Sequence, residues 1–248
     1  MKARTVAVLS LVMLSAAAVA ACREPPPVPP QTPVDSSSLH LSPPTKAPED
    51  AGNAPASIAG NNAALSSDAI KAIVSAPDRT EGDLKMDVHR HPEHLLVFTG
   101  VAPGMNVADL GSGGGYTTEL LARAVGTSGK VYAQNDPALV KKFMEKSIVE
   151  RLARPADKNV VRVDRPFDDP FPPEAKNLDL VTMVIFYHDT VHLGVNRDTM
   201  NRAVFDALKP GGMFVVLDAS AKDGDGTNDA KTLHRIEPSV VKAEVEKA

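Results

Sequence analysis

The chain has 248 residues, with 27 basic and 31 acidic side chains and a formal net charge of −4 at pH 7, so we expect no nucleic-acid partner. Tryptophan is absent and aromatic residues make up 4% of the sequence, so aliphatic side chains must build the core. The length is enough for one α/β domain with appendages.

The first residues have the features of an export signal. Lys2 and Arg4 precede a run of small and apolar residues that is too short for a convincing membrane span. The run ends in Val19-Ala20-Ala21-Cys22, which resembles the lipobox of bacterial lipoprotein signal peptides. The resemblance implies that residues 1–22 are such a signal and that acylated Cys22 anchors an exported protein to a membrane, facing the periplasm or cell exterior. The alternative is an ordinary signal peptide cleaved nearby, with a free thiol.

Residues 23–64 are predicted to form a disordered linker. Ten prolines lie between positions 25 and 55 among Ser, Thr, Ala and Asn, with few large apolar residues. Such a segment cannot bury enough surface to offset its ordering entropy. The folded domain is therefore assigned to residues 65–248.

Strand and helix patterns alternate through this domain. Apolar runs predict strands at 106–110, 130–134, 159–163, 178–186 and 213–217. Helical spacing predicts helices at 67–75, 89–98, 117–125, 137–152, 197–208 and 238–248, with a loop at 79–83. The alternation indicates an α/β fold with a doubly wound, mostly parallel sheet. A ligand should lie at the carboxyl ends of its strands, where the strand order reverses.

A glycine-rich turn follows the first of these strands. The strand ends at Asp109-Leu110, and glycines at 111, 113 and 115 allow a tight turn before the next helix. The free N–H groups of that helix point into the same space. A dinucleotide pattern counted from Gly111 needs a small residue where this chain has Tyr116. A structural turn without a ligand is the plainer alternative.

Three motifs in order resemble class I S-adenosylmethionine (SAM) dependent methyltransferases, across about residues 103–219. They are Asp109-x-Gly111-x-Gly113-x-Gly115, Asn177-Leu178-Asp179-Leu180-Val181 and Leu208-Lys209-Pro210-Gly211-Gly212. The tract Phe186-Tyr187-His188-Asp189 is similar to that of exported or lipoprotein-type predicted methyltransferases.

The resemblance implies SAM as the cofactor. In the family the glycine loop cradles the methionine part, and an acid after the second strand binds the ribose. That position holds Asn135 here, and Asp136 follows; an N-cap role is the alternative for Asp136. Residues after the third strand often contact the adenine, although Asp164 could instead begin a turn. The candidate cofactor-binding residues are Asp109, Gly111, Ser112, Gly113, Gly115, Tyr116, Asn135, Asp136, Asp164 and Arg165.

The candidate catalytic residues follow the fourth strand. Methyl transfer requires alignment of nucleophile and methyl group, and a base helps when the acceptor carries a proton. We predict His188 as the base, Asp189 as its orienting partner and Tyr187 as a pocket wall or hydrogen-bond donor. In the alternative interpretation these residues only shape the strand end.

The same tract allows a metal-site interpretation. His188-Asp189-Thr190-Val191-His192 resembles the H-E-x-x-H motif of metal hydrolases, which requires both histidines on one helical face. The preceding strand and the β-branched Thr190 and Val191 argue against a helix. We therefore assign no metal ligand and keep a metal hydrolase as the weaker alternative.

In the family the sheet ends in an antiparallel hairpin. This sequence has no residues for that hairpin after the last predicted helix, so a truncated chain and an open sheet edge are expected.

We predict SAM-dependent methyl transfer to a small-molecule acceptor by a monomeric, membrane-tethered domain. The alternative is a non-catalytic SAM- or nucleoside-binding module, which Asn135 and an extracytoplasmic location without an evident SAM supply favour.

Overall fold

The structure, a computed structural model, describes residues 64–248. The predicted signal, Cys22 and the linker up to residue 63 lie outside the described residues, so these interpretations stay predictions. Within residues 64–248, no helix has the length and apolar character needed to cross a bilayer.

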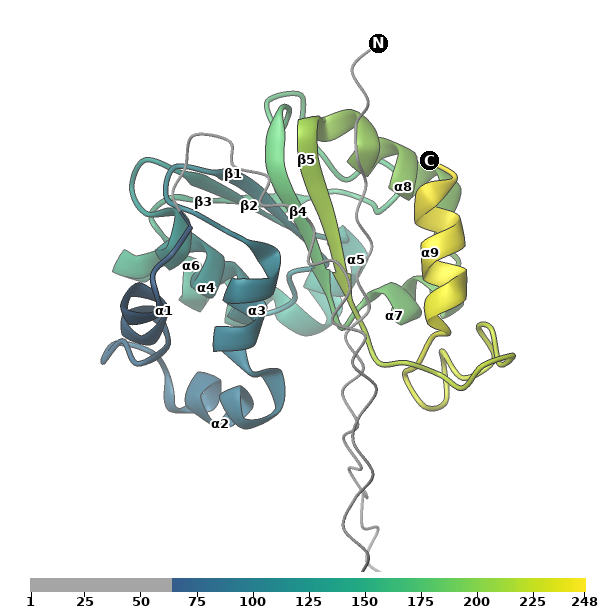
Figure 1. Ribbon diagram of the computed structural model, residues 1–248, viewed down its shortest axis with the longest axis horizontal. Helices are drawn as coiled ribbons and strands as arrows, with labels where there is room; N and C mark the ends of the chain where they lie inside the picture. Colours follow the sequence, from purple (N-terminus) through teal and green to yellow (C-terminus); the bar gives the residue numbers. More distant parts are fainter. Residues whose placement is uncertain (1–63) are drawn as a thin grey trace, which may run out of the picture. The chain divides into compact units, whose positions relative to one another are not determined.

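The described residues form one parallel sheet with the strand order β3-β2-β1-β4-β5 (Figure 1). The strands are β1 (Asn106–Leu110), β2 (Lys130–Asn135), β3 (Val160–Asp164), β4 (Leu178–Val184) and β5 (Leu208–Leu217). The chain builds outward from β1 to β3 and then returns to the other side of β1, which creates a topological switch between β1 and β4. The predicted doubly wound α/β sheet is confirmed.

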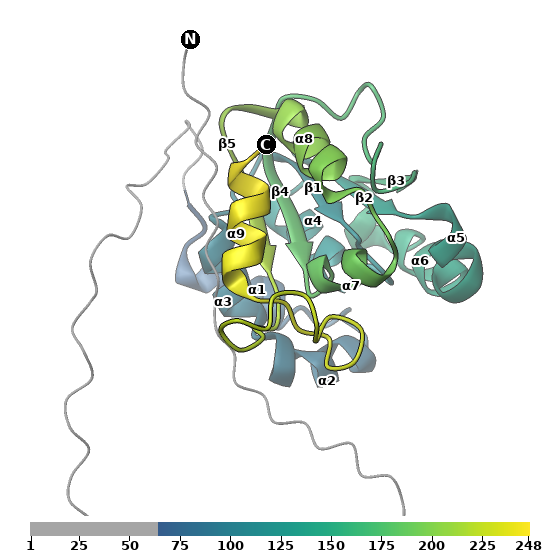
Figure 2. The ribbon, with the colours of Figure 1, turned by 90° about the vertical axis from the view of Figure 1, so that its right-hand side faces the viewer.

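Helices cover both faces of the sheet (Figures 1 and 2). The apolar side chains of one face pack with α1 (Ser67–Val74), α3 (Pro92–Thr99) and α4 (Tyr116–Val125). Those of the other face pack with α7 (Tyr187–His192), α8 (Arg197–Ala207) and α9 (Pro238–Glu246). This two-sided burial explains why β4 is almost wholly apolar. The remaining helical segments are α2 (Glu81–Arg90), α5 (Pro137–Leu139), a π-helical turn (Val140–Met144), α6 (Glu145–Leu152) and a 3₁₀ turn (Pro155–Asp157).

The segment before the sheet differs from its prediction. Instead of a loop at 79–83 and one helix at 89–98, the chain forms α2 and α3, separated by His91 at φ 45°. The backbone N–H of Asp83 donates to Thr80 Oγ1 over 3.1 Å, so Thr80 caps α2. A capped but mostly polar helix lacks the apolar periodicity that would have identified it.

The segment after β4 also differs. The strand ends at Val184 rather than at 186, Ile185 has φ 52°, and α7 begins at Tyr187. The Thr190 hydroxyl donates to the Tyr187 carbonyl oxygen over 2.6 Å, so this β-branched residue supports the helical turn. The expectation that residues 188–192 are not helical is therefore wrong.

β5 forms one edge of the sheet, and residues 64–248 contain no antiparallel hairpin beside it. The chain that follows β5 returns so that Ser220 and Ile236 form a parallel bridge. α9 then buries Val241 and Val245 in the core. These elements place the segment 218–237 at the carboxyl end of β5, next to α7.

Candidate functional site

A cavity of about 430 Å³ opens at the glycine-rich turn between β1 and α4. Its size lies within the range of small-molecule sites, ~300–1,000 Å³. It is lined by side chains or backbone of Met86, Arg90, Asp109, Gly111, Ser112, Gly113, Gly114, Tyr116, Thr117, Ser147, Arg151, Val184, Ile185 and Phe186. The glycine-loop residues predicted to bind a cofactor line this cavity, with the exception of Gly115. Gly115 is the N-cap residue of α4.

The glycines of the loop serve different physical needs. Gly111 has φ 73°, and a Cβ there would lie 2.8 Å from the Phe186 ring. Gly113 has φ 57°, and nothing lies within 4 Å of the position its Cβ would take. Gly111 thus allows close packing, whereas Gly113 keeps the cavity open.

Asp109 lies at the floor of the cavity and is 1% exposed. Its carboxylate accepts hydrogen bonds from Thr118 Oγ1 over 2.7 Å and from Thr182 Oγ1 over 3.0 Å. Burial raises the pKa of Asp109 to about 6, against the opposing effect of these two bonds. The side chain is therefore fixed in place by α4 and β4.

Asn135 holds the glycine loop rather than facing the cavity. Its Oδ1 accepts from the backbone N–H of Gly113 over 2.8 Å, and its Nδ2 donates to Ser112 Oγ over 2.8 Å. The neighbouring Gln134 Oε1 accepts from the backbone N–H of Gly111 over 3.0 Å. The amide at the predicted ribose position is thus occupied by the protein's own loop.

The other residues predicted for the ribose and adenine also have protein partners. Asp136 Oδ1 accepts from the backbone N–H of Ala138 over 2.9 Å, as an N-cap of α5. Asp164 pairs with Arg162 over 2.7 Å, and Arg165 pairs with Asp169. Asp136, Asp164 and Arg165 do not line the cavity.

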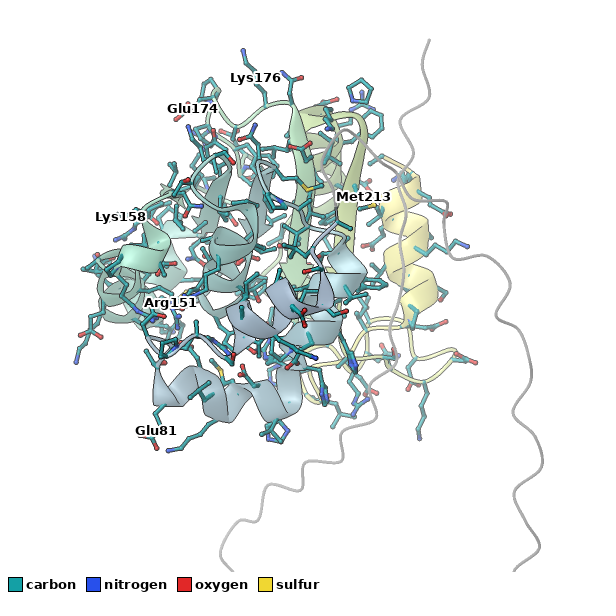
Figure 3. All side chains as sticks on the ribbon, turned by 60° about the vertical axis from the view of Figure 1, so that its left-hand side comes forward. Glu81, Arg151, Lys158, Glu174, Lys176 and Met213 are labelled. Atoms are coloured by element: carbon teal, nitrogen blue, oxygen red, sulfur yellow. The ribbon has the colours of Figure 1, made fainter. Side chains whose placement is uncertain are left out.

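Helix α2 closes one side of the cavity through two sets of polar contacts. The Tyr116 hydroxyl donates to Asp87 Oδ1 over 2.6 Å, and the Arg79 guanidinium donates to both oxygens of Asp87. On the other side, Arg151 of α6 (labelled in Figure 3) donates to Asp83 over 2.7 Å and to the Gly114 carbonyl oxygen over 2.8 Å. Arg151 thereby links α2 to the glycine loop.

Tyr187 points away from the cavity and into the core. It is fully buried, and its hydroxyl donates to Glu244 Oε2 over 2.8 Å and accepts from Asn201 Nδ2 over 2.9 Å. These partners belong to α8 and α9. The structure therefore does not bring Tyr187 to the cavity wall, where the sequence had placed it.

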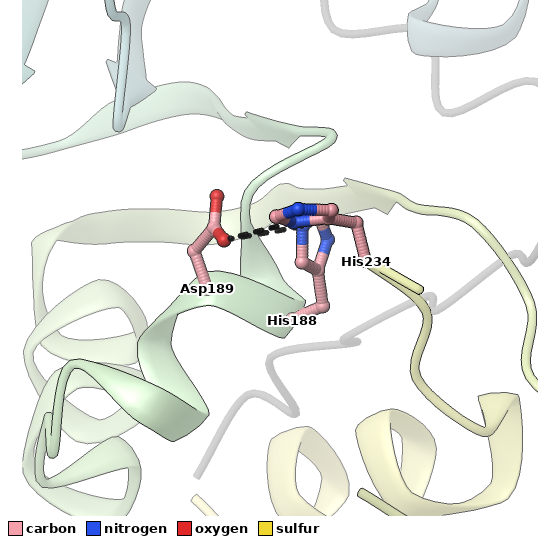
Figure 4. A group of neighbouring side chains, drawn as sticks. All are labelled: His188, Asp189 and His234. Carbon is pink, nitrogen blue, oxygen red and sulfur yellow. Dashed lines mark hydrogen bonds and ion pairs between the residues drawn. The ribbon is translucent and has the colours of Figure 1, made fainter. Parts of the chain in front are cut away.

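His188, the second residue of α7, lies in a polar cluster rather than in the cavity lining (Figure 4). Its Nδ1 lies 2.7 Å from Asp218 Oδ1, and its Nε2 lies 3.2 Å from Asp189 Oδ1 and 3.3 Å from His234 Nδ1. Burial lowers the pKa of His188, but the bonds and charges of the two carboxylates outweigh it and raise the pKa to about 9. At neutral pH the ring holds its proton and is poorly suited to be a general base.

Sequence reasoning missed several residues at the site. Asp218 follows β5, so the rule that ligands gather at strand ends could have pointed to it. Met86 and Arg90 lie on the unpredicted α2. His234 lies 46 positions after His188 in a polar loop, and no local pattern indicates the contact.

Comparison with known proteins bears on the fold. No protein-family model matches the chain. The structure is similar to that of a SAM-dependent methyltransferase from Aquifex aeolicus, with a TM-score of 0.53 and 21% identity, over 70% of this chain and 85% of that chain.

Two weaker similarities are to a SAM-dependent O-methyltransferase from Thermotoga maritima and an arsenic(III) SAM methyltransferase from Chlamydomonas reinhardtii. The former has a TM-score of 0.37 and 23% identity over 60% of this chain and 49% of that chain. The latter has a TM-score of 0.49 and 16% identity over 72% of this chain and 60% of that chain. Together with the sheet topology, the similarity to the Aquifex protein shows that the chain has the Rossmann-like fold of class I methyltransferases.

Proposed function

We propose that the chain is a SAM-dependent methyltransferase with a small-molecule acceptor. The observation that carries this proposal is the cavity beneath the glycine loop, at the topological switch between β1 and β4. The space above Gly113 and the fixed carboxylate of Asp109 fit the amino-acid half of SAM. The name of the Aquifex relative supports the same cofactor.

When bound, the cofactor would supply a methyl group on a positively charged sulfur. The glycine loop, Asp109 and Tyr116 would hold it, and Arg90 lies where it can pair with a carboxylate. Helix α2 would exclude water from one side. Holding acceptor and methyl group in line would then account for most of the catalysis.

Calorimetry of the full chain with SAM and with its demethylated product tests the cofactor, and mass spectrometry of acceptors incubated with labelled SAM tests transfer. We expect both compounds to bind with one site per chain. If neither binds at millimolar concentration, the proposal is wrong.

A second function, a binding module that retains the cavity without turnover, is favoured by two observations. The Asn135 amide is bonded to the glycine loop, and Tyr187 is bonded to Glu244 and Asn201 in the core. Neither is free for ligand or catalysis. Binding of SAM without transfer to any of a broad panel of acceptors would support the module.

We further propose that the domain is a monomer held to a bacterial membrane, on its periplasmic or outer side, by lipid on Cys22. The apolar run that ends at this single cysteine supports the proposal. Cys22→Ala should move the protein from membrane to soluble fractions of the expressing bacterium. Unchanged membrane association would contradict lipidation.

A further inference from the structure

A cluster of three imidazoles and two carboxylates joins α7 to the segment after β5. Figure 4 shows three of its members, His188, Asp189 and His234. Its centre is formed by three atoms, namely His188 Nε2, Asp189 Oδ1 and His234 Nδ1, which face one another from two segments of the chain. The two sides of the cluster lie 46 positions apart in sequence and are brought together only by the fold. We propose that His188, Asp189 and His234 bind a divalent transition-metal ion of the zinc type.

The spacing of the three atoms fits such an ion. His188 Nε2 lies 3.2 Å from Asp189 Oδ1 and 3.3 Å from His234 Nδ1, and His234 Nδ1 lies 3.6 Å from Asp189 Oδ1. Zinc bonds to nitrogen and oxygen are about 2.0–2.2 Å long, which places the ligand atoms of a tetrahedral site about 3.3–3.6 Å apart. The three atoms therefore already form one face of a tetrahedron of that size.

His188 is oriented as metal-binding histidines usually are. Its other ring nitrogen, Nδ1, lies 2.7 Å from Asp218 Oδ1, and Asp218 Oδ2 accepts from the His188 backbone N–H over 2.8 Å. A carboxylate on one imidazole nitrogen fixes the ring and directs the other nitrogen toward the metal. Asp218 is thus a positioning residue.

Charge and chemistry favour a transition metal over other cations. The carboxylates of Asp189 and Asp218 flank a buried ring, so a metal ion that displaces the proton of His188 Nε2 still gains their attraction. Two imidazole ligands suit Zn²⁺ and similar ions, whereas Mg²⁺ and Ca²⁺ prefer oxygen. The side chain of His234 is 65% exposed, which leaves the site open to solvent and to further ligands.

The backbone of His234 supports the same interpretation. His234 has φ 54°, a left-handed conformation that is uncommon for a residue other than glycine. This conformation places the ring against His188 and Asp189. A metal ion there would fasten the segment 218–237 to α7, and binding would therefore stabilise the folded chain.

The experiment uses the full chain, purified without a polyhistidine tag and stripped of metal by a chelator. Titration with ZnCl₂ against a competing chelator, and metal analysis after dialysis, measure affinity and stoichiometry. We expect one Zn²⁺ per chain, a higher Tm with Zn²⁺, and no such effect of Mg²⁺.

Three variants test the site: one removes a ligand, one removes the positioning residue and one is the control. His234→Ala changes an exposed side chain and should weaken Zn²⁺ binding at least tenfold and abolish the Tm increase. Asp218→Asn should weaken binding about 10–100-fold, as loss of a partner behind a ligand does. His89→Ala, an exposed histidine on α2, is the matched control and should bind as the unchanged protein does.

Two results would overturn the proposal. One is failure of the unchanged chain to bind Zn²⁺ or Co²⁺ stoichiometrically, which would leave the cluster as a set of hydrogen-bonded ion pairs. The other is equal Zn²⁺ affinity of the His234→Ala and His89→Ala variants. If Asp218→Asn does not fold, as judged by circular dichroism, the comparison of Zn²⁺ affinity between His234→Ala and His89→Ala tests the proposal without it.

Discussion

Asn135 and Gly113 are hydrogen-bonded in both directions. The Gly113 N–H donates to Asn135 Oδ1 over 2.8 Å, and Asn135 Nδ2 donates to the Gly113 carbonyl oxygen over 3.1 Å. The side chain is 3% exposed, so the shape of the glycine loop depends on an amide that can both donate and accept.

The first prediction concerns Asn135→Asp. A carboxylate would put an acceptor opposite the Gly113 carbonyl oxygen and bury a charge, so the variant should lose about 1–3 kcal/mol of unfolding free energy. Its SAM affinity should fall or stay unchanged. Urea unfolding and calorimetry measure the two quantities.

Asn228→Asp is the control, because it adds the same charge at an exposed position. It should change the unfolding free energy by less than about 0.5 kcal/mol. Tighter SAM binding by Asn135→Asp would instead indicate that position 135 contacts the ribose, as in the family it resembles.

The second prediction compares two glycines that both have a positive φ. Gly113 and Gly126 have φ 57° and 63°, and neither has an atom within 4 Å of its Cβ position. Alanine should therefore destabilise both by about 1–3 kcal/mol, and Gly126 the more, because its ψ of −169° lies in a region open essentially only to glycine. Only Gly113 lines the cavity, so only Gly113→Ala should also weaken SAM binding, by about tenfold or more, or 1.4 kcal/mol. Equal SAM affinities of the two variants, measured by calorimetry, would place the cofactor elsewhere.

The third prediction concerns the ion pairs that hold α2. Arg151 contacts Asp83 and Glu119, whose side chains are 3% and 2% exposed. Arg151→Met should cost about 1–3 kcal/mol, because buried Asp83 keeps only Arg154, 3.8 Å away, whereas Glu119 keeps both Arg123 and Arg154. Lys146→Met on the same helix removes an 89% exposed side chain and is the control for urea unfolding. A loss below 1 kcal/mol for Arg151→Met would show that α2 does not depend on this contact.

The sequence was informative where the structure depends on local pattern. The strand 106–110 has the predicted bounds because its apolar run, its acid and the glycines after it act within one short segment. The helix predicted at 197–208 begins as predicted and ends one residue earlier, at Ala207; its cap Asn196 accepts from the Thr199 N–H over 3.1 Å. These segments, together with the other strands, define the doubly wound sheet.

The sequence was uninformative where contacts between distant segments determine the structure. Thr190 and Val191 argued against a helix, but residues 187–192 form α7, whose first residue, Tyr187, bonds Glu244, 57 positions later. His188 meets His234 only after the segment beyond β5 folds back. The side chains of the predicted catalytic tract thus face the core and the histidine cluster.

The last prediction concerns pH and Asp157, which is 1% exposed. Neither of its carboxylate oxygens has a hydrogen-bond partner among residues 64–248. Burial, and then the charge of Glu119, raise the pKa of Asp157 from 3.8 to about 6. The folded chain therefore holds this proton at pH values where the unfolded chain has released it. The contribution of the protonated Asp157 to the unfolding free energy is fully present below about pH 4. It is lost as the pH rises through about 6.

Asp157→Asn cannot ionise, so its unfolding free energy relative to the unchanged protein should increase between pH 4 and pH 7. The increase should reach at most about 3 kcal/mol, since each pKa unit corresponds to about 1.4 kcal/mol. Urea unfolding across this range measures it, with the exposed Asp168→Asn as the control whose difference from the unchanged protein stays flat. A difference for Asp157→Asn that also stays flat would mean that water or a neighbouring arginine already neutralises the buried carboxylate.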